Sequence, residues 1–155
     1  MLLPVIAKIF GVLFVVLVIF VHPSDGKENK KHSNDYNFCF EEAAATYGIH
    51  PNLLWAIAYI ESRFNPRAIN KNKNNTYDYG IMQINSSWYN VLKNDWQYLS
   101  DPCYNIKVGA WILSNCIEKH GYNWEAVGCY NARSPEKRKK YSYKIYKVLK
   151  KYGAL

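Results

Sequence analysis

The sequence lacks the cysteine and histidine patterns that hold metal ions. Its four cysteines form no CxxC pair and its four histidines are not paired, so we expect neither a metal site nor a cofactor. It also lacks internal repeats, and a length of 155 residues fits one domain. The chain is therefore expected to be a single domain that works without a metal.

Acidic residues are scarce. Twelve Asp and Glu stand against 20 Lys and Arg, which gives a formal net charge of +8 at pH 7. Basic exported proteins tend to meet anionic polymers, namely cell wall, membrane surface or nucleic acid, and export disfavours nucleic acid as a partner. The lysines are concentrated in residues 135–153, where a solvated helix face is the plainer interpretation.

Long apolar runs are absent beyond the start of the chain. Lys8 precedes an uncharged apolar run at 9–21, which is the layout of a secretory signal. We expect residues 1–26 to be a signal peptide that is cleaved on export. An uncleaved anchor is the alternative, because 2–21 approaches the roughly 20 residues that span a bilayer. Residues 27–38 have no apolar periodicity and are expected to be a flexible lead-in.

Four cysteines behind an export signal predict disulfides. If residues 101–121 form one helix, Cys103 and Cys116 are 13 residues apart, which is about 20 Å at 1.5 Å per residue. Bonded cysteines need Cα atoms within about 7 Å, so this pair is excluded. Cys116 and Cys129 flank the turn GYNW and suit a clasp across a helical hairpin. Cys39–Cys103 is then the second predicted bridge.

Most of the remaining chain has the composition of helices and residues typical of helix ends. Gly48 is typical of a helix C-cap and Pro51 of a first helical turn. The asparagine-rich residues 70–80 predict turns or a small hairpin. The expected helices are 38–48, 50–64, 101–121, 124–132 and 140–153. The fold class is therefore mostly α, an α+β or nearly all-α domain with one small β segment.

Glu61 has the position of a buried acid. Leu54, Ile57, Ala58 and Glu61 share one helix face, so the carboxyl group is expected to point toward the apolar interior. It also lies in the last helical turn, where the helix dipole disfavours negative charge. Both effects raise its pKa, as a general acid near neutrality requires. The alternative is a surface glutamate paired with a nearby arginine.

Motifs around Glu61 and Asp78 resemble two related families. TYDYGIMQINSSWY resembles the segment of animal-type lysozyme that carries its second catalytic aspartate, and the 17-residue interval between the two acids is that of lysozyme. AIAYIESRFNPRAIN, YNIKVGAWIL and WEAVGCYNA resemble the bacterial soluble lytic transglycosylase domain, with its Glu-Ser, Gly-x-Met-Gln, Asn-Ile and Tyr-Asn motifs. The resemblance covers residues 39–132, and Arg133 departs from the glycine that usually follows.

The resemblance implies a lysozyme-like domain at 39–132, with a β-hairpin-like segment beside the substrate groove and a basic C-terminal helix at 133–155. In size, export signal and lysine-rich ending, the chain is most similar to the small transglycosylases attached to type III secretion, type IV secretion or pilus systems. The expected partners are therefore peptidoglycan glycan strands and components of such an apparatus. The expected protein is a periplasmic monomer, held at the inner membrane if the signal is retained.

The resemblance also implies a reaction and its residues. Glu61 would protonate the MurNAc-β-1,4-GlcNAc bond of peptidoglycan and then act as base to close a 1,6-anhydro ring, with Asp78 in a subordinate role. Ser62 and Tyr130 would hold Glu61 by hydrogen bonds. The other expected substrate contacts are Met82, Gln83, Asn85, Trp88 and Asn131. For Met82 and Trp88, packing in the core is an equal alternative.

Two other functions fit the same motifs. A lysozyme-type muramidase would use Glu61 and Asp78 to hydrolyse the same bond with water. A noncatalytic wall-binding adaptor would keep the groove and dock a secretion apparatus through the basic tail. The intact acid and its neighbours argue against the adaptor, because a buried acid costs stability.

Overall fold

The computed structural model describes residues 36–155, so the predicted signal peptide and most of the predicted lead-in lie outside the described residues. The described part is mostly helical, with one small antiparallel sheet, and the predicted fold class is confirmed. Its helices are α1 Asn37–Tyr47, α2 Pro51–Ser62, α3 Tyr89–Leu92, α4 Pro102–His120, α5 Trp124–Asn131 and α6 Pro135–Lys151. The strands are β1 Ile69–Lys71, β2 Tyr77–Tyr79 and β3 Ile84–Asn85, followed by the 3-10 segments η1 Ser86–Trp88 and η2 Lys93–Ser100.

Local sequence signals set the helix ends. Gly48 ends α1 in the left-handed region at φ 64°, which glycine adopts without steric cost. Pro51 occupies the first turn of α2. The side chain of Asp101 accepts a hydrogen bond of 2.7 Å from the backbone N–H of Tyr104 and so caps α4. These ends agree with the predicted helices.

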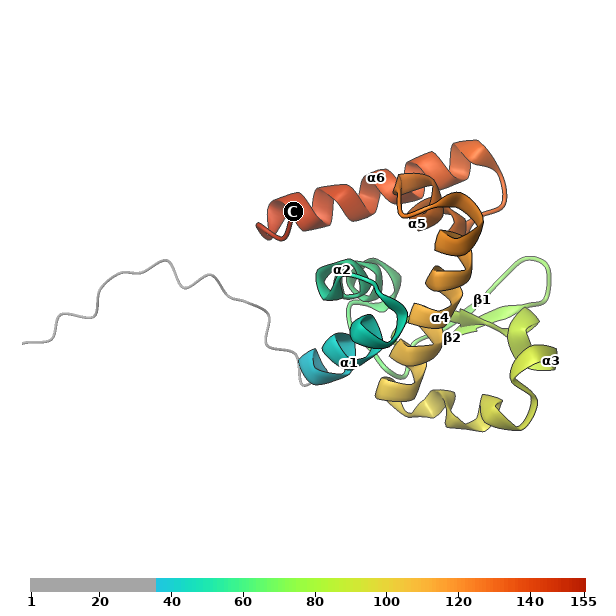
Figure 1. The fold of residues 1–155 in the computed structure, drawn as a ribbon. Coiled ribbons are helices and arrows are strands. Elements are labelled where there is room, and N and C mark those ends of the chain that lie inside the picture. Colours follow the sequence, from blue (N-terminus) through green and yellow to red (C-terminus); the bar gives the residue numbers. More distant parts are fainter. Residues whose placement is uncertain (1–35) are drawn as a thin grey trace, which may run out of the picture.

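The helices form one body around α4. Figure 1 shows α2 between α1 and α6, and the contacts of α2 with both neighbours agree with that view. Apolar side chains from these helices and from the sheet segment form one core, including Leu54, Ile57, Ile84, Leu113 and Ile145. Within residues 36–155 we find no helix with the length and apolar character needed to cross a membrane.

Two disulfides brace this helical body. Cys39–Cys103 joins α1 to α4, and Cys116–Cys129 joins α4 to α5. Both bridges are the predicted ones, and a pair of structural disulfides fits an exported protein.

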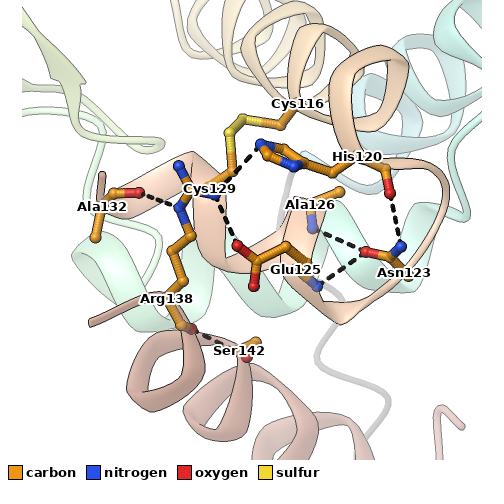
Figure 2. A network of polar contacts seen from close by, with 9 residues as sticks. All are labelled: Cys116, His120, Asn123, Glu125, Ala126, Cys129, Ala132, Arg138 and Ser142. Atoms are coloured by element: carbon orange, nitrogen blue, oxygen red, sulfur yellow. Dashed lines mark hydrogen bonds and ion pairs between the residues drawn. A yellow bond between two sulfur atoms is a disulfide. The ribbon is translucent and has the colours of Figure 1, made fainter. Parts of the chain in front are cut away.

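A polar clamp sets the junction between α5 and α6. The guanidinium group of Arg138 forms an ion pair of 2.7 Å with Glu125 and donates a hydrogen bond of 3.0 Å to the carbonyl oxygen of Ala132 (Figure 2). Gly128 allows the close approach, because a Cβ atom there would lie 2.5 Å from Cβ of Arg138. The clamp helps to orient α6, whose inner face packs on α2.

The small sheet has the strand order β1-β2-β3, with both pairings antiparallel. Asp78 in β2 lies opposite Asn70 of β1 and Asn85 of β3. Directly paired strand residues point to the same face, so these three polar side chains gather on one side of the sheet. The hairpin predicted within residues 70–80 is present.

Candidate active site

Glu61 lies in the last turn of α2, where the chain then turns sharply. Arg63 and Phe64, which follow directly, both adopt left-handed conformations with φ 55° and 64°. The pKa of Glu61 is raised from its usual 4.5 to about 7. Burial is the largest cause, and the negative charge of Asp78 adds to it, whereas a hydrogen bond from Tyr141 and the charge of Lys144 act in the opposite direction.

Tyr141 of α6 holds Glu61 in place. Its hydroxyl group donates a hydrogen bond of 2.5 Å to Oε1 of the carboxyl group. The Tyr141 ring stacks with that of Tyr130, with ring centroids 6.5 Å apart. Burial followed by the nearby charge of Glu61 raises the pKa of both tyrosines well above the usual value, so both hydroxyl groups stay protonated donors.

Ser62 and Tyr130 do not hold Glu61, and that prediction is wrong. The hydroxyl group of Ser62 donates to the carbonyl oxygen of Ile81 at 2.7 Å, and that of Tyr130 donates to the carbonyl oxygen of Met82 at 2.8 Å. Both side chains therefore fasten the segment between β2 and β3 to the helices. The acceptors are backbone carbonyl oxygens of that segment, and the hydrogen bond to the Glu61 carboxyl group comes from Tyr141.

Asp78 lies in a polar network. Its Oδ1 accepts a hydrogen bond of 2.6 Å from Nδ2 of Asn85, and its Oδ2 accepts one of 2.9 Å from Nδ2 of Asn72. Both amides also donate to the hydroxyl group of Thr76, which in turn donates to the side chain of Asn74. Amide donors on both oxygens suit an ionised carboxylate.

Asn105 of α4 holds the turn that follows β2 by hydrogen bonds. This buried side chain accepts from the N–H of Met82 at 2.9 Å and donates to the carbonyl oxygens of Tyr79 and Leu99. Gly80 makes room for it, because a Cβ atom at that position would overlap Nδ2 of Asn105. Asn105 thus fixes the spacing between Asp78 and the core.

Two of the predicted substrate contacts face inward. The side chain of Met82 is fully buried, so the core alternative holds for it and its side chain does not line a groove. The amide of Gln83 donates to the carbonyl oxygens of Ala68 and Gly80 and accepts from Asn70. Because these bonds occupy the amide, Gln83 braces the sheet from within.

The remaining predicted contacts lie nearer the surface. Trp88 is partly buried and packs edge to face on Trp111, with ring centroids 5.2 Å apart. Asn131 is exposed at the end of α5. Asn85 bonds Asp78 and is partly buried. Within the described residues, no three His, Cys, Asp or Glu side chains gather where they could hold a metal ion.

Sequence reasoning missed Tyr141 and the structural role of Asn105. Tyr141 lies in the lysine-rich segment that was interpreted as a solvated helix. The sequence pattern that indicates its burial is the spacing of Tyr141, Ile145 and Leu149. These three side chains stand at i, i+4 and i+8 on one helix face, and all are buried. Asn105 belongs to the Asn-Ile motif noted above, although the sequence does not show what its amide bonds.

The fold and this pair of carboxyl groups define a class of protein. A helical body with a small sheet places a partly buried glutamate near an aspartate held in a polar turn, an arrangement typical of lysozyme-like glycoside-cleaving enzymes. Residues 38–151 match the model of the family described as the transglycosylase SLT domain. The chain belongs to that family, and it is a peptidoglycan lytic transglycosylase.

Curated relatives extend the similarity. The chain is 42% identical over 121 residues to "Invasion protein IagB" of Salmonella typhimurium (strain LT2), which covers 73% of this chain and 76% of that protein. It is 41% identical over 117 residues to "Protein IpgF" of Shigella flexneri, covering 70% and 77%. It is 38% identical over 132 residues to a "Peptidoglycan-binding-like protein" of Escherichia coli O157:H7, covering 76% and 79%.

Proposed function

We propose that Glu61 cleaves the MurNAc-β-1,4-GlcNAc bond of peptidoglycan as general acid and then general base, releasing 1,6-anhydro-muropeptides. The observation that carries this proposal is a carboxyl group whose pKa is raised to about 7 by burial and whose position is held by Tyr141. A group that titrates near neutrality exchanges its proton readily in both directions.

The proposed reaction has two steps. In the first, Glu61 donates its proton to the glycosidic oxygen, the bond from that oxygen to the anomeric carbon breaks, and positive charge develops on the sugar ring. In the second, the Glu61 carboxylate takes the proton of the muramic C6 hydroxyl group while that oxygen bonds to the anomeric carbon. No water is consumed, and Glu61 ends protonated as it began.

Asp78 is proposed to stabilise the positive charge that develops between the two steps. Two amide groups hold its carboxylate, and its charge raises the Glu61 pKa, so the two groups are electrostatically coupled. The same arrangement favours a second candidate, lysozyme-type hydrolysis, in which water attacks the anomeric carbon in place of the C6 hydroxyl group. Asn85, Trp88 and Asn131 are the proposed sugar contacts.

The proposed place of action is the periplasm, where the enzyme would open the wall locally for a secretion system or pilus. Support for export comes from the two disulfides and from the apolar start of the sequence. Support for the apparatus comes from similarity to a protein named "Invasion protein IagB".

Mass spectrometry of the products tests the proposal. Purified peptidoglycan is digested with the wild-type protein and with Glu61→Gln, and the released muropeptides are analysed. Anhydro-muramic ends from the wild type alone support the proposed reaction. Reducing ends would instead identify the hydrolase, and release by Glu61→Gln at the wild-type rate would remove Glu61 from the chemistry.

A further inference from the structure

The sheet has a second face that the proposed mechanism does not use. Asp78 and its partner Asn70 point to one face. Successive residues of a strand point to opposite faces, so Tyr77 and Tyr79 lie on the other face, and the neighbours of Asn70 in β1 do the same. One short strand therefore presents a carboxylate on one side and two tyrosines on the other.

A groove of about 700 Å³ lies on this second face, and we call it the back-face groove. Its lining comes from β1, β2, the turn between them and η2, and includes Ile69, Lys71, Tyr77, Tyr79, Trp96 and Gln97. The volume falls within the range of roughly 300–1,000 Å³ typical of small-ligand sites. Neither Glu61 nor Asp78 lines this groove, but Asn72 and Thr76 do, and Asn72 donates a hydrogen bond to Asp78, so the groove adjoins the Asp78 network without containing either carboxyl group.

The groove combines aromatic walls with available polar groups. Trp96 packs edge to face with Tyr77 and with Tyr89, at centroid distances of 6.1 and 5.7 Å. Tyr77 remains 37% exposed, so ring surface is open to a ligand. Across residues 36–155, the side chains of Lys71 and Gln97 take part in no hydrogen bond or ion pair. A cation and an amide donor are therefore free to bind a partner.

These groups match the chemistry of an N-acetylated sugar chain. Aromatic rings pack on the apolar C–H faces of pyranose rings, and a tyrosine adds a polar tip. A free amide pairs with acetamido groups and hydroxyl groups, and a lysine pairs with carboxylates. The net charge of +8 favours a carboxylate-bearing polymer over a neutral one.

We propose that the back-face groove binds a second stretch of the peptidoglycan glycan strand, outside the stretch that is cleaved. Sugar rings pack on Tyr77 and Trp96, Gln97 bonds an acetamido group, and Lys71 pairs with a carboxylate of the stem peptides that the strand carries. Holding a polymer at a second point raises its effective concentration at the first. The identity of the polymer rests on the proposed function, whereas the groove itself does not.

Binding is measured without cleavage to keep the two proposals apart. The exported protein with Glu61→Gln is sedimented with purified peptidoglycan sacculi, alone and with Lys71→Ala or Gln97→Ala added. Both positions are exposed, so the fold is kept, and circular dichroism checks it. Each change is expected to raise Kd by about three- to tenfold, the factor that one lost hydrogen bond is typically worth. The matched control Lys119→Ala removes the same charge from the exposed end of α4 and is expected to leave Kd unchanged.

Two further arms separate binding of the sugar chain from binding of its stem peptides and from a general loss of activity. Gln97→Ala should show the same loss on glycan strands stripped of stem peptides as on intact sacculi, and a loss confined to intact sacculi would overturn the assignment to sugar. With Glu61 restored, Lys71→Ala is expected to raise KM on long strands and leave turnover of a tetrasaccharide unchanged. Unaltered binding to sacculi, or equal losses on long and short substrates, would refute a second binding site.

Discussion

The two carboxyl groups of the candidate site, Glu61 and Asp78, lie in regions that differ in what stabilises them. Glu61 ends a helix in the apolar body that carries both disulfides, and its pKa is raised to about 7 by burial. Asp78 lies in the sheet region at 69–100, which neither disulfide enters, and amide side chains hold its oxygens. The same functional group thus lies in two different surroundings, and the proposed roles follow them: proton transfer for Glu61 and charge stabilisation for Asp78.

Glu61→Gln is expected to have the largest effect. The amide has nearly the same shape and carries no transferable proton, so the rate on purified peptidoglycan should fall by roughly 10³-fold or more. Dye release from labelled sacculi measures this rate. The exposed Glu118→Gln is the matched control and should retain full activity.

Glu61→Gln should also be more stable than the wild type above neutral pH. The raised pKa means that, between about pH 4.5 and 7, folded Glu61 keeps a proton that the unfolded chain releases. The free energy of unfolding therefore falls as pH rises through this window, and the cost is complete above about pH 7. Glu61→Gln removes the cost, so its Tm should exceed that of the wild type at pH 8 and approach it at pH 4. A reversed order in thermal unfolding would contradict the burial of the acid.

Asp78→Asn is expected to have the second largest effect. Loss of one preorganised charge should lower the rate by about 10²–10³-fold with the fold intact. The charge of Asp78 raises the Glu61 pKa, so its removal should also move the alkaline limb of the pH–rate profile to lower pH. Asp95→Asn removes a charge from an exposed position of η2 as a control. Full rate in Asp78→Asn would leave Asp78 as a turn residue only.

Tyr141→Phe should act more weakly and shift the pH profile in the opposite direction. In the wild type, the hydrogen bond from Tyr141 lowers the Glu61 pKa. Its removal should therefore raise that pKa and move the alkaline limb of the pH–rate profile to higher pH. The rate near neutrality should fall by about tenfold because the carboxyl group is less well positioned. An alkaline limb that stays in place while stability drops would assign Tyr141 a packing role alone.

The disulfides should affect activity least. Replacing Cys116 and Cys129 by serine opens a loop with a sequence separation of 13, which should cost about 3 kcal/mol of stability. Replacing Cys39 and Cys103 opens one with a separation of 64 and should cost about 4 kcal/mol. Urea unfolding compares the two. At temperatures where both variants are folded, their rates should stay within about twofold of the wild type, because neither bridge contacts Glu61 or Asp78.

Much of this arrangement was predictable from local sequence. Gly48, Pro51 and Asp101 mark helix ends by the same physics in any context, and helix length alone excluded one cysteine pairing. Glu61 was predictable as a buried acid because its helix face is apolar. These features depend on residues that are near one another along the chain.

The partner of Glu61 was not predictable in the same way. Tyr141 is 80 residues away and reaches the carboxyl group only because α6 packs across α2. Ser62 and Tyr130 carry hydroxyl groups of the right kind, but the choice between a carboxylate and a backbone carbonyl depends on distances of about an ångström. The burial of Met82 also depends on a residue far along the chain, because Gly109 on α4 leaves room for its side chain in the core.

Titration of the Glu61 carboxyl carbon by NMR tests the central claim most directly. The wild-type resonance, identified by its absence in Glu61→Gln, should titrate near pH 7, as burial and the Asp78 charge require. It should move to lower pH in Asp78→Asn and to higher pH in Tyr141→Phe. A Glu61 that titrates at its ordinary value in all three proteins would contradict the account.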